Sequence, residues 1–211
     1  MPTVTRKEHY HGAVGLWAGI FIAVLLWSIY HPKDWPTWWM EALPALIGFV
    51  LVIRYRVIVG ITPLVYWLIL LHCIVLMVGA HYTYAEVPLF SDLEHWLQQT
   101  RNNYDKIGHF LQGFVPAMIA RELLLRQKVF SSKAWMSFFI VCFVLAFSAF
   151  YELVEWSAAM ILKTGAEAFL GTQGDEWDTQ TDMLFALIGG IVALMTLSKR
   201  HDQQLLYFSS R

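Results

Sequence analysis

Residues 62–80 read TPLVYWLILLHCIVLMVGA, a run that contains no charged side chain. About 20 helical residues cross a hydrocarbon core of ~30 Å, so an uncharged run of this length predicts a membrane-spanning helix. The rest of the chain has the same character, because 57% of its 211 residues are hydrophobic and only 15% are charged. Soluble domains carry about a quarter charged residues. The sequence therefore predicts an integral membrane protein.

Five further apolar segments surround this run. Together they predict an all-α fold, a polytopic membrane helical bundle with about six transmembrane helices. The expected spans are residues 13–30, 39–53, 62–80, 108–125, 134–162 and 183–198. No internal repeat or low-complexity tract divides them, so residues 1–211 are expected to form a single transmembrane domain.

A short interfacial helix is expected over residues 90–97. Ser91 and Glu94 have the spacing of a capping box, which predicts a helix that starts at Ser91. Phe90, Leu93 and Trp96 would share its apolar face. Such a helix either lies on the surface of the outer leaflet or packs on the end of the bundle.

The distribution of positive charge predicts the orientation. In a six-span chain, eleven of the 15 lysines and arginines fall on the side of the two termini and four fall on the other side. Cytoplasmic loops carry an excess of these residues, so both termini are expected in the cytoplasm. The acidic residues divide the opposite way, with thirteen of 16 on the outer side.

Ionisable side chains gather at the outer ends of four expected spans. The candidate catalytic residues among them are His81, Asp105, His109, Glu152, Glu155, Asp178 and Asp182. Residues three or four apart share one face of a helix, and a polar face on an apolar helix turns toward the bundle interior. The side chains of the last three spans are therefore expected to meet in one pocket.

Several carboxylates in one pocket repel each other unless something compensates their charge. The compensation can come from a bound divalent metal, from protonation, or from nearby cations such as Arg101 and Lys106. Carboxylate and imidazole ligands suit zinc, manganese or iron, and an open coordination position can activate water. The expected metal ligands are Asp105, His109, Glu152, Glu155, Asp178 and Asp182. A structural polar cluster and a proton or ion pathway are the alternative interpretations.

Several motifs resemble those of the YjdF family of bacterial inner-membrane proteins. They are His31-Pro32-Lys33-Asp34, His81–Pro88, Asp105-x-x-Gly108-His109-Phe110-x-Gln112-Gly113, Tyr151-Glu152-x-x-Glu155-Trp156 and Gly171–Asp182. The resemblance covers nearly the whole chain and implies a multi-pass protein of the bacterial inner membrane. It implies no particular activity.

The second half of the chain has a more distant similarity to the VanZ-like membrane proteins. The shared pattern is Asp105-Lys106-x-x-His109, a glutamate at Glu152, and Asp178 followed by a polar residue four positions later. Glu155 and Asp182 stand where that pattern tends to have amides, so the present site is more acidic. The added acidity favours a bound cation.

Three functions fit these residues. The first is a metal-dependent enzyme that acts on a lipid or envelope substrate at the outer, periplasmic face. The second is a small-ion or proton-coupled transporter, since carboxylates and histidines line such pathways. The third is a non-catalytic envelope protein whose acidic face holds a partner. The expected partners are the lipid bilayer and a lipid or envelope-component substrate, and no nucleic acid.

Overall fold

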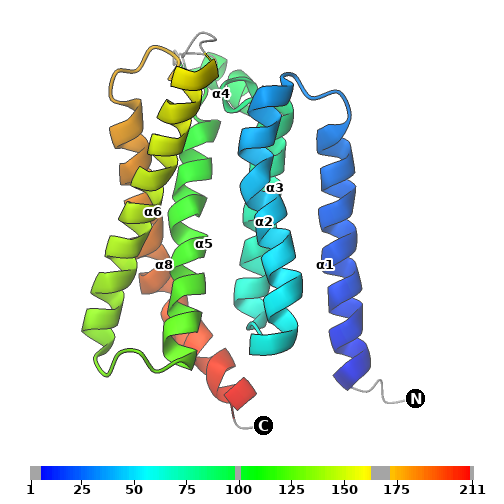
Figure 1. Cartoon of the computed structure of the whole chain (residues 1–211), viewed down its shortest axis with the longest axis vertical. Helices are drawn as coiled ribbons and strands as arrows, with labels where there is room; N and C mark the ends of the chain where they lie inside the picture. The colour runs from blue at the N-terminus through cyan, green and yellow to red at the C-terminus, as the bar shows by residue number, and fades with distance from the viewer. Residues whose placement is uncertain (1–5, 98–100, 163–171, 210–211) are drawn as a thin grey trace.

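The computed structural model describes residues 6–97, 101–162 and 172–209, and every regular element among them is helical. Six long helices run side by side, as Figure 1 shows. They are α1 (Arg6–Ile29), α2 (Trp35–Val59), α3 (Pro63–Tyr82), α5 (Tyr104–Arg126), α6 (Lys133–Leu162) and α8 (Asp178–Ser209). The predicted all-α membrane bundle is confirmed.

Hydropathy agrees with most of the expected spans. α2, α3, α6 and α8 each contain a stretch long and apolar enough to cross a membrane, and α1 contains a shorter apolar stretch, Val14–Ile29. α5 is less apolar because it carries charged residues, among them Asp105, Arg121 and Glu122. These three side chains are buried against other helices, as polar groups within membrane helices are expected to be. That all six helices cross the bilayer remains a prediction.

The helices extend beyond their apolar segments. α2 covers residues 35–59 rather than the expected 39–53, and α8 begins at Asp178 rather than at residue 183. Helical hydrogen bonding continues into the more polar interfacial layer, which is why hydropathy alone places the ends too far inward. As a consequence Asp178 and Asp182 both belong to α8 and lie about one turn apart.

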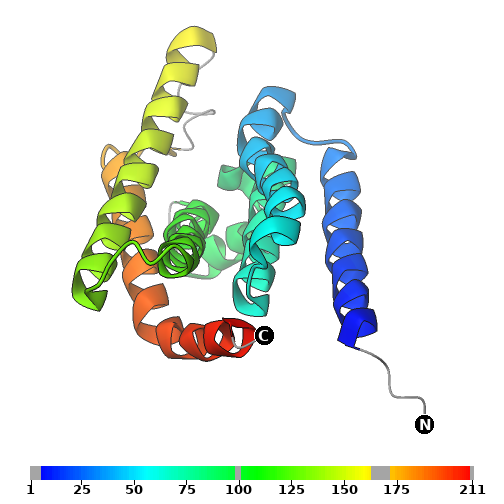
Figure 2. The same cartoon turned by 60° about the horizontal axis from the view of Figure 1, so that its bottom comes forward.

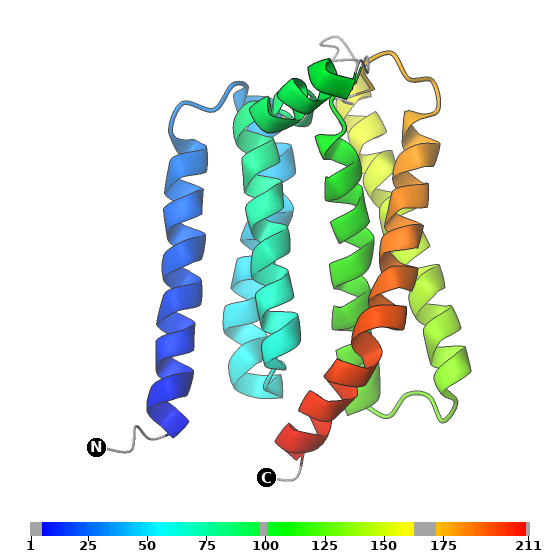
Figure 3. The same cartoon turned by 180° about the vertical axis from the view of Figure 1, so that it is seen from behind.

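The two ends of the bundle differ. α1 begins and α8 ends at one end, which we call the terminal end (Figures 1 and 3). The connection from α1 to α2, the start of α8 and the short helix α4 (Pro88–Leu97) lie at the opposite end, which we call the α4 end. Figure 2 shows α5 in the middle, between the pair α6 and α8 and the pair α2 and α3.

The short helix at the α4 end starts earlier than its sequence suggests. α4 begins at Pro88, directly after the 3₁₀ turn η1 (Tyr84–Glu86), and crosses the end of the bundle between α3 and α5 (Figure 3). Proline is favoured in the first turn of a helix because its missing N–H would be unpaired there anyway. Ser91 lies inside the first turn, and its hydroxyl donates to the carbonyl of Val87 at 3.3 Å. The predicted capping box is therefore wrong.

Glycine brings α5 and α8 into backbone contact. A Cβ atom on Gly113 would lie 1.7 Å from the carbonyl oxygen of Ala186, and one on Gly189 would lie 2.0 Å from that of Phe110. Both helices run from the α4 end to the terminal end (Figure 3). His109 lies four residues before Gly113, and Asp182 lies four residues before Ala186. The contact therefore fixes these two side chains at the same depth in the bundle.

A buried polar network joins α3, α5 and α8 at the terminal end. Glu122 accepts hydrogen bonds from the backbone N–H of Thr62 at 2.8 Å and from its hydroxyl at 2.6 Å. Arg121 Nη1 lies 2.7 Å from His201 Nδ1, and His201 Nε2 lies 3.2 Å from Glu122 Oε2. A guanidinium only donates, so His201 accepts at Nδ1 and donates from Nε2 to Glu122. The network satisfies the N–H of Thr62, the residue before α3, and anchors α5 against α8.

Candidate metal centre at the α4 end

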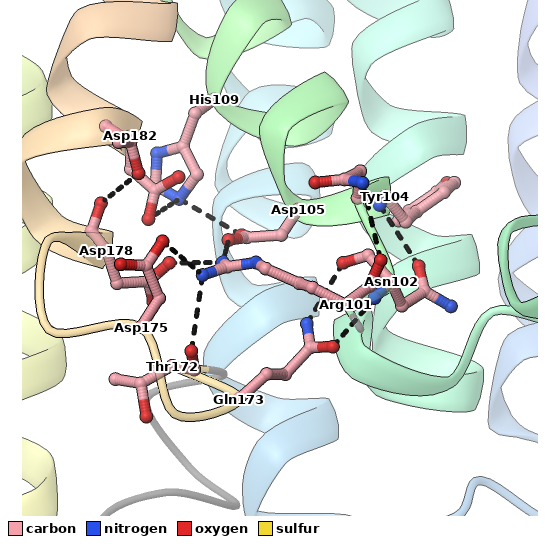
Figure 4. Close-up of polar contacts among 12 residues, drawn as sticks. Arg101, Asn102, Tyr104, Asp105, His109, Thr172, Gln173, Asp175, Asp178 and Asp182 are labelled. Atoms are coloured by element: carbon pink, nitrogen blue, oxygen red, sulfur yellow. Dashed lines mark hydrogen bonds and ion pairs between the residues drawn. The ribbon is translucent and has the colours of Figure 1, made fainter. Parts of the chain in front are cut away.

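The first turns of α5 present Asp105, His109 and Gln112 on one buried face. His109 Nε2 lies 3.3 Å from Asp105 Oδ1 and 3.9 Å from Asp182 Oδ2 on α8. Figure 4 shows these three side chains turned toward one another. One ligand atom from each, taken together, lies within 4.8 Å of the other two. Ligands bound at ~2.1 Å to one tetrahedral ion lie about 3.4 Å apart, so a small contraction would enclose a metal ion.

The two nitrogens of His109 face different groups. Nδ1 lies 2.8 Å from Gln112 Oε1 and 3.7 Å from Glu152 Oε1. Both neighbours are acceptors, so Nδ1 carries the ring proton. Nε2 faces the carboxylate oxygens of Asp105 and Asp182, and its lone pair would be repelled by them. A cation is required at that position, either a proton on Nε2 or a metal ion.

Arg101 is the cation nearest to this cluster. Its guanidinium pairs with Asp105 at 2.9 Å, with Asp175 at 3.3 Å and with Asp178 (Figure 4). Burial by itself would lower the pKa of Arg101, but the negative charges of Asp178 and Asp105 raise it above its ordinary value. The guanidinium therefore stays charged. One such charge balances only part of the four buried carboxylates, which are Asp105, Glu152, Asp178 and Asp182.

The backbone next to Arg101 is held in place by hydrogen bonds between Asn102 and Gln173. The side chain of Gln173 accepts from the Asn102 N–H at 2.8 Å and donates to the Asn102 carbonyl at 3.0 Å. Arg101 also donates to the carbonyl of Thr172 at 3.2 Å. These bonds fix the start of α5 against the turn before α8. Lys106, the other expected cation, lies over the ring of Phe185 at 5.8 Å.

Three acidic side chains in the cluster have a buried oxygen without a hydrogen-bond donor. Asp178 Oδ1 forms an ion pair with Arg101, and the other two oxygens are Asp182 Oδ1 and Glu152 Oε1. Asp182 is 3% exposed and Glu152 is 9% exposed, so solvent does not supply the missing donors. A buried acceptor left unpaired costs about 1–3 kcal/mol, and more when it is charged. The missing positive charge and the missing donors can be supplied by a bound cation or by protons on these carboxylates.

A cavity of about 190 Å³ lies next to the cluster, between α2, α3, α5 and α6. Asp105 and His109 line it as well as facing Asp182. Glu155 lines this cavity, whereas Glu152, one turn earlier on α6, faces His109. The structure thus divides the two glutamates between adjacent compartments. Apolar side chains such as Val115, Ile119 and Phe147 line the cavity further along α5 and α6.

The expected site residues do not all meet. Asp105, His109, Glu152, Asp178 and Asp182 come together, and Glu155 lies in the adjoining cavity. His81 lies elsewhere: its Nδ1 is 3.2 Å from the carbonyl of Ser28, and its ring packs on Trp27 at 4.3 Å between centroids. It shares the depth of the cluster but points toward α1. The expectation that it joins the cluster is wrong.

Other residues of the site carry weak signals in the sequence. Glu41 and His72 line the cavity from α2 and α3, yet each is a lone polar residue in an apolar run, which favours an interfacial or packing role. Tyr84 and Tyr151 complete the polar part of the lining. The one available signal for Glu41 is that an acidic residue within an expected span is costly unless it has a partner.

The helical bundle with its apolar spans defines a multi-pass membrane protein. The chain belongs to the family described as "Predicted membrane protein (DUF2238)", which matches residues 13–203. It is 45% identical over 185 residues to the inner membrane protein YjdF of Escherichia coli (strain K12), covering 88% of each chain. The resemblance to the YjdF family is thereby confirmed. No solved structure matches the chain.

Proposed function

We propose that this protein is a divalent-metal-dependent hydrolase of the bacterial inner membrane, with its site at the periplasmic face and an amphiphilic lipid or envelope molecule as substrate. The observation that carries the proposal is the position of His109 Nε2 between the carboxylates of Asp105 and Asp182, at the edge of a cavity. Three protein ligands with an open fourth position are the usual arrangement of a hydrolytic metal site.

Each residue has a role in this proposal. Asp105, His109 and Asp182 hold the ion, and Gln112 orients the imidazole through Nδ1, as outer-shell partners of metal-bound histidines do. A bound ion would supply Lewis-acid activation of water and substrate. The Oδ1 atom of Asp182, which has no hydrogen-bond donor, would take the proton of the attacking water and return it to the leaving oxygen as the ester or phosphoester bond breaks. Arg101 and Asp178 hold Asp105 in place.

Charge supports the periplasmic position of the site. Arg121, Arg126 and Lys133 lie near the terminal end, with the ends of α1 and α8. An excess of Lys and Arg marks the cytoplasmic side, so the terminal end is assigned to the cytoplasm and the α4 end to the periplasm. The name of the E. coli relative supports the inner membrane as the location.

One-sided polarity supports an enzyme rather than a transport pathway. Between Gln112 and Arg121, α5 consists of the residues GFVPAMIA, which offer no titratable side chain. The polar cluster at the α4 end is thus separated on α5 from the network at the terminal end by more than two helical turns. A proton or ion pathway would need polar groups across that distance.

The decisive experiment measures metal in the purified protein. Elemental mass spectrometry is expected to find about one divalent ion per chain in the parent and little in His109→Ala and Asp182→Asn. Glu176→Gln is the matched control, because Glu176 is an exposed acidic residue in the turn before α8. A folded parent that holds no metal after supply of zinc, manganese or iron would overturn the proposal.

A further inference from the structure

The cavity beside the metal centre has an unusual set of ionisable groups. Its walls carry the carboxylates of Glu41, Asp105 and Glu155 and the imidazoles of His72 and His109. Among the described residues that line it there is no lysine or arginine. Arg101 does not line the cavity, and it forms ion pairs with Asp105, Asp175 and Asp178. The cavity is therefore built to receive positive charge.

Glu41 and Glu155 are the acidic pair of this cavity that has no lysine or arginine partner among the described lining residues. They approach from different helices, α2 and α6, and repel each other. Glu41 Oε2 is buried without a hydrogen-bond donor, and so is His72 Nε2 on the neighbouring wall. Two carboxylates that face one low-dielectric space need protons or a cationic ligand between them.

The ligand set favours an ammonium group over a second metal ion. Among the described residues, the three side chains whose ligand atoms lie close enough together to share a metal are Asp105, His109 and Asp182, and neither Glu41 nor Glu155 belongs to such a group of three. An ammonium group carries three N–H donors and can be held by two carboxylates without a third protein ligand. Tyr84 and Tyr151 line the same space, and aromatic rings attract cations.

The remainder of the lining is suited to hydrocarbon. Ile69, Leu76 and Val115 lie on its α3 and α5 walls, with Ile119 and Phe147 beside them. The volume of about 190 Å³ is far above the ~10–15 Å³ that one water molecule needs. A ligand that fills the cavity is complementary to both the acidic and the apolar part of its lining only if it has a positively charged head and an apolar body.

We infer that this cavity binds an amphiphile with a primary ammonium headgroup, with the ammonium group between Glu41 and Glu155 and the hydrocarbon against Ile119 and Phe147. This inference names the substrate class of the proposed hydrolase and rests on that function for its catalytic meaning. The reacting ester or phosphoester next to the ammonium group would then face Asp105 and His109, which line both the cavity and the metal centre.

Lipid binding without turnover tests the inference. Full-length protein in detergent is titrated with phosphatidylethanolamine, phosphatidylglycerol or phosphatidylcholine of the same chain length, and bound lipid is counted by native mass spectrometry. Phosphatidylethanolamine is expected to bind about tenfold or more tightly than the other two, since it alone offers N–H donors to a charged acceptor. Equal binding of the three lipids overturns the inference.

Variants connect the preference to the two glutamates. Glu41→Gln with Glu155→Gln is expected to remove the preference for phosphatidylethanolamine, whereas Glu176→Gln keeps it. Phe147→Trp narrows the apolar part of the cavity and is expected to weaken the binding of all three lipids to the same extent. If the double glutamine variant does not fold, each single variant is expected to lower the preference several-fold. Unchanged preference in the folded glutamine variants overturns the inference.

Two further measurements distinguish a lipid from a free ammonium compound, and the inference from the proposed function. Free ethanolamine and phosphoethanolamine should compete with the lipid only at far higher concentration. Competition at equal concentration would overturn the inference that the ligand is an amphiphile. Metal content is measured on the same samples. Metal without a lipid preference refutes the inference alone, whereas a lipid preference in metal-free protein refutes the hydrolase alone.

Discussion

At the scale of single residues, the site depends on His109. Its Nδ1 proton is held by Gln112, and its Nε2 is directed at two carboxylates. The orientation of the ring thus decides whether the three ligand atoms can converge. The same side chain borders the cavity, so a change in its orientation would alter the candidate metal centre and the cavity together.

Replacing Gln112 by leucine tests this orienting role. The variant removes the acceptor for Nδ1 while it keeps a side chain of similar size. Loss of such an outer-shell partner typically lowers metal affinity about 10- to 100-fold. Competition of the purified variant with a fluorescent zinc chelator measures the change. Affinity equal to that of the parent would show that Glu152 alone orients the ring.

Removal of Arg101 tests the charge balance of the cluster. Arg101→Ala leaves Asp105 and Asp178 buried without their partner, which costs roughly 3–5 kcal/mol when a buried pair is broken. A lower thermal midpoint in detergent is the expected result. Saturating metal should recover part of the loss, because the ion supplies the missing positive charge. Arg101→Ala that unfolds at the temperature of the parent would contradict this role.

Metal removal gives a prediction for the parent itself. A ligand that binds only the folded state stabilises it by ~2.7 kcal/mol at a free concentration one hundred times its Kd. A chelator is therefore expected to lower the thermal midpoint of the parent but not that of His109→Ala. Scanning fluorimetry with and without chelator measures both. A similar shift in both proteins would locate the metal effect outside the site.

At the scale of elements, the contact between α5 and α8 sets the geometry. Gly113→Ala would place a Cβ 1.7 Å from the carbonyl oxygen of Ala186, so the helices must separate. Overpacking of this kind typically costs about 1–3 kcal/mol. The separation should also move Asp182 away from His109 and reduce bound metal. Gly19→Ala in α1 is the control, because nothing lies within 4 Å of its added Cβ. Unchanged metal content in Gly113→Ala would contradict the argument.

Helical periodicity also explains which parts of the site were predictable. Asp105 and His109 are four residues apart on one helix, so their shared face follows from local geometry alone. Glu152 and Glu155 are three apart, and their directions differ by about 60°, which is enough to aim them at two compartments. The expectation for His81 rests on its depth in the membrane, but depth does not give the direction in which a side chain points. Its position against α1 depends on tertiary packing.

At the scale of the whole molecule, the apolar spans and the bundle could be predicted because hydropathy reports directly on the membrane. The extended ends of α2 and α8 could not, because residues such as Arg54, Arg56 and Asp178 interrupt the apolar pattern there. Neither could the pairing of Arg101 with the turn before α8, which joins residues 71–74 positions apart. The cavity is equally a product of packing, since its walls come from four helices.

The polar network at the terminal end and the acidic cluster at the α4 end are expected to respond independently to substitution. Glu122→Gln weakens the bonds to Thr62, Arg126 and His201, so the thermal midpoint should fall. Removing one member of a buried charged network typically costs several kcal/mol. Metal per folded chain should stay at the level of the parent, because the network lies at the opposite end of the bundle. Loss of metal in folded Glu122→Gln would show that the two ends are coupled.

The backbone contact between α5 and α8 also determines which helices can move to admit a ligand. A carbonyl packed against glycine leaves no room for one helix to slide or rock against the other, so this pair acts as a rigid wall. On the other side, a hydrogen bond of 3.4 Å from the Tyr151 hydroxyl to the Met40 carbonyl joins α6 to α2. We therefore expect a ligand to enter from the surrounding lipid where α2 and α6 part and this hydrogen bond breaks, while Asp105, His109 and Asp182 on α5 and α8 keep their positions.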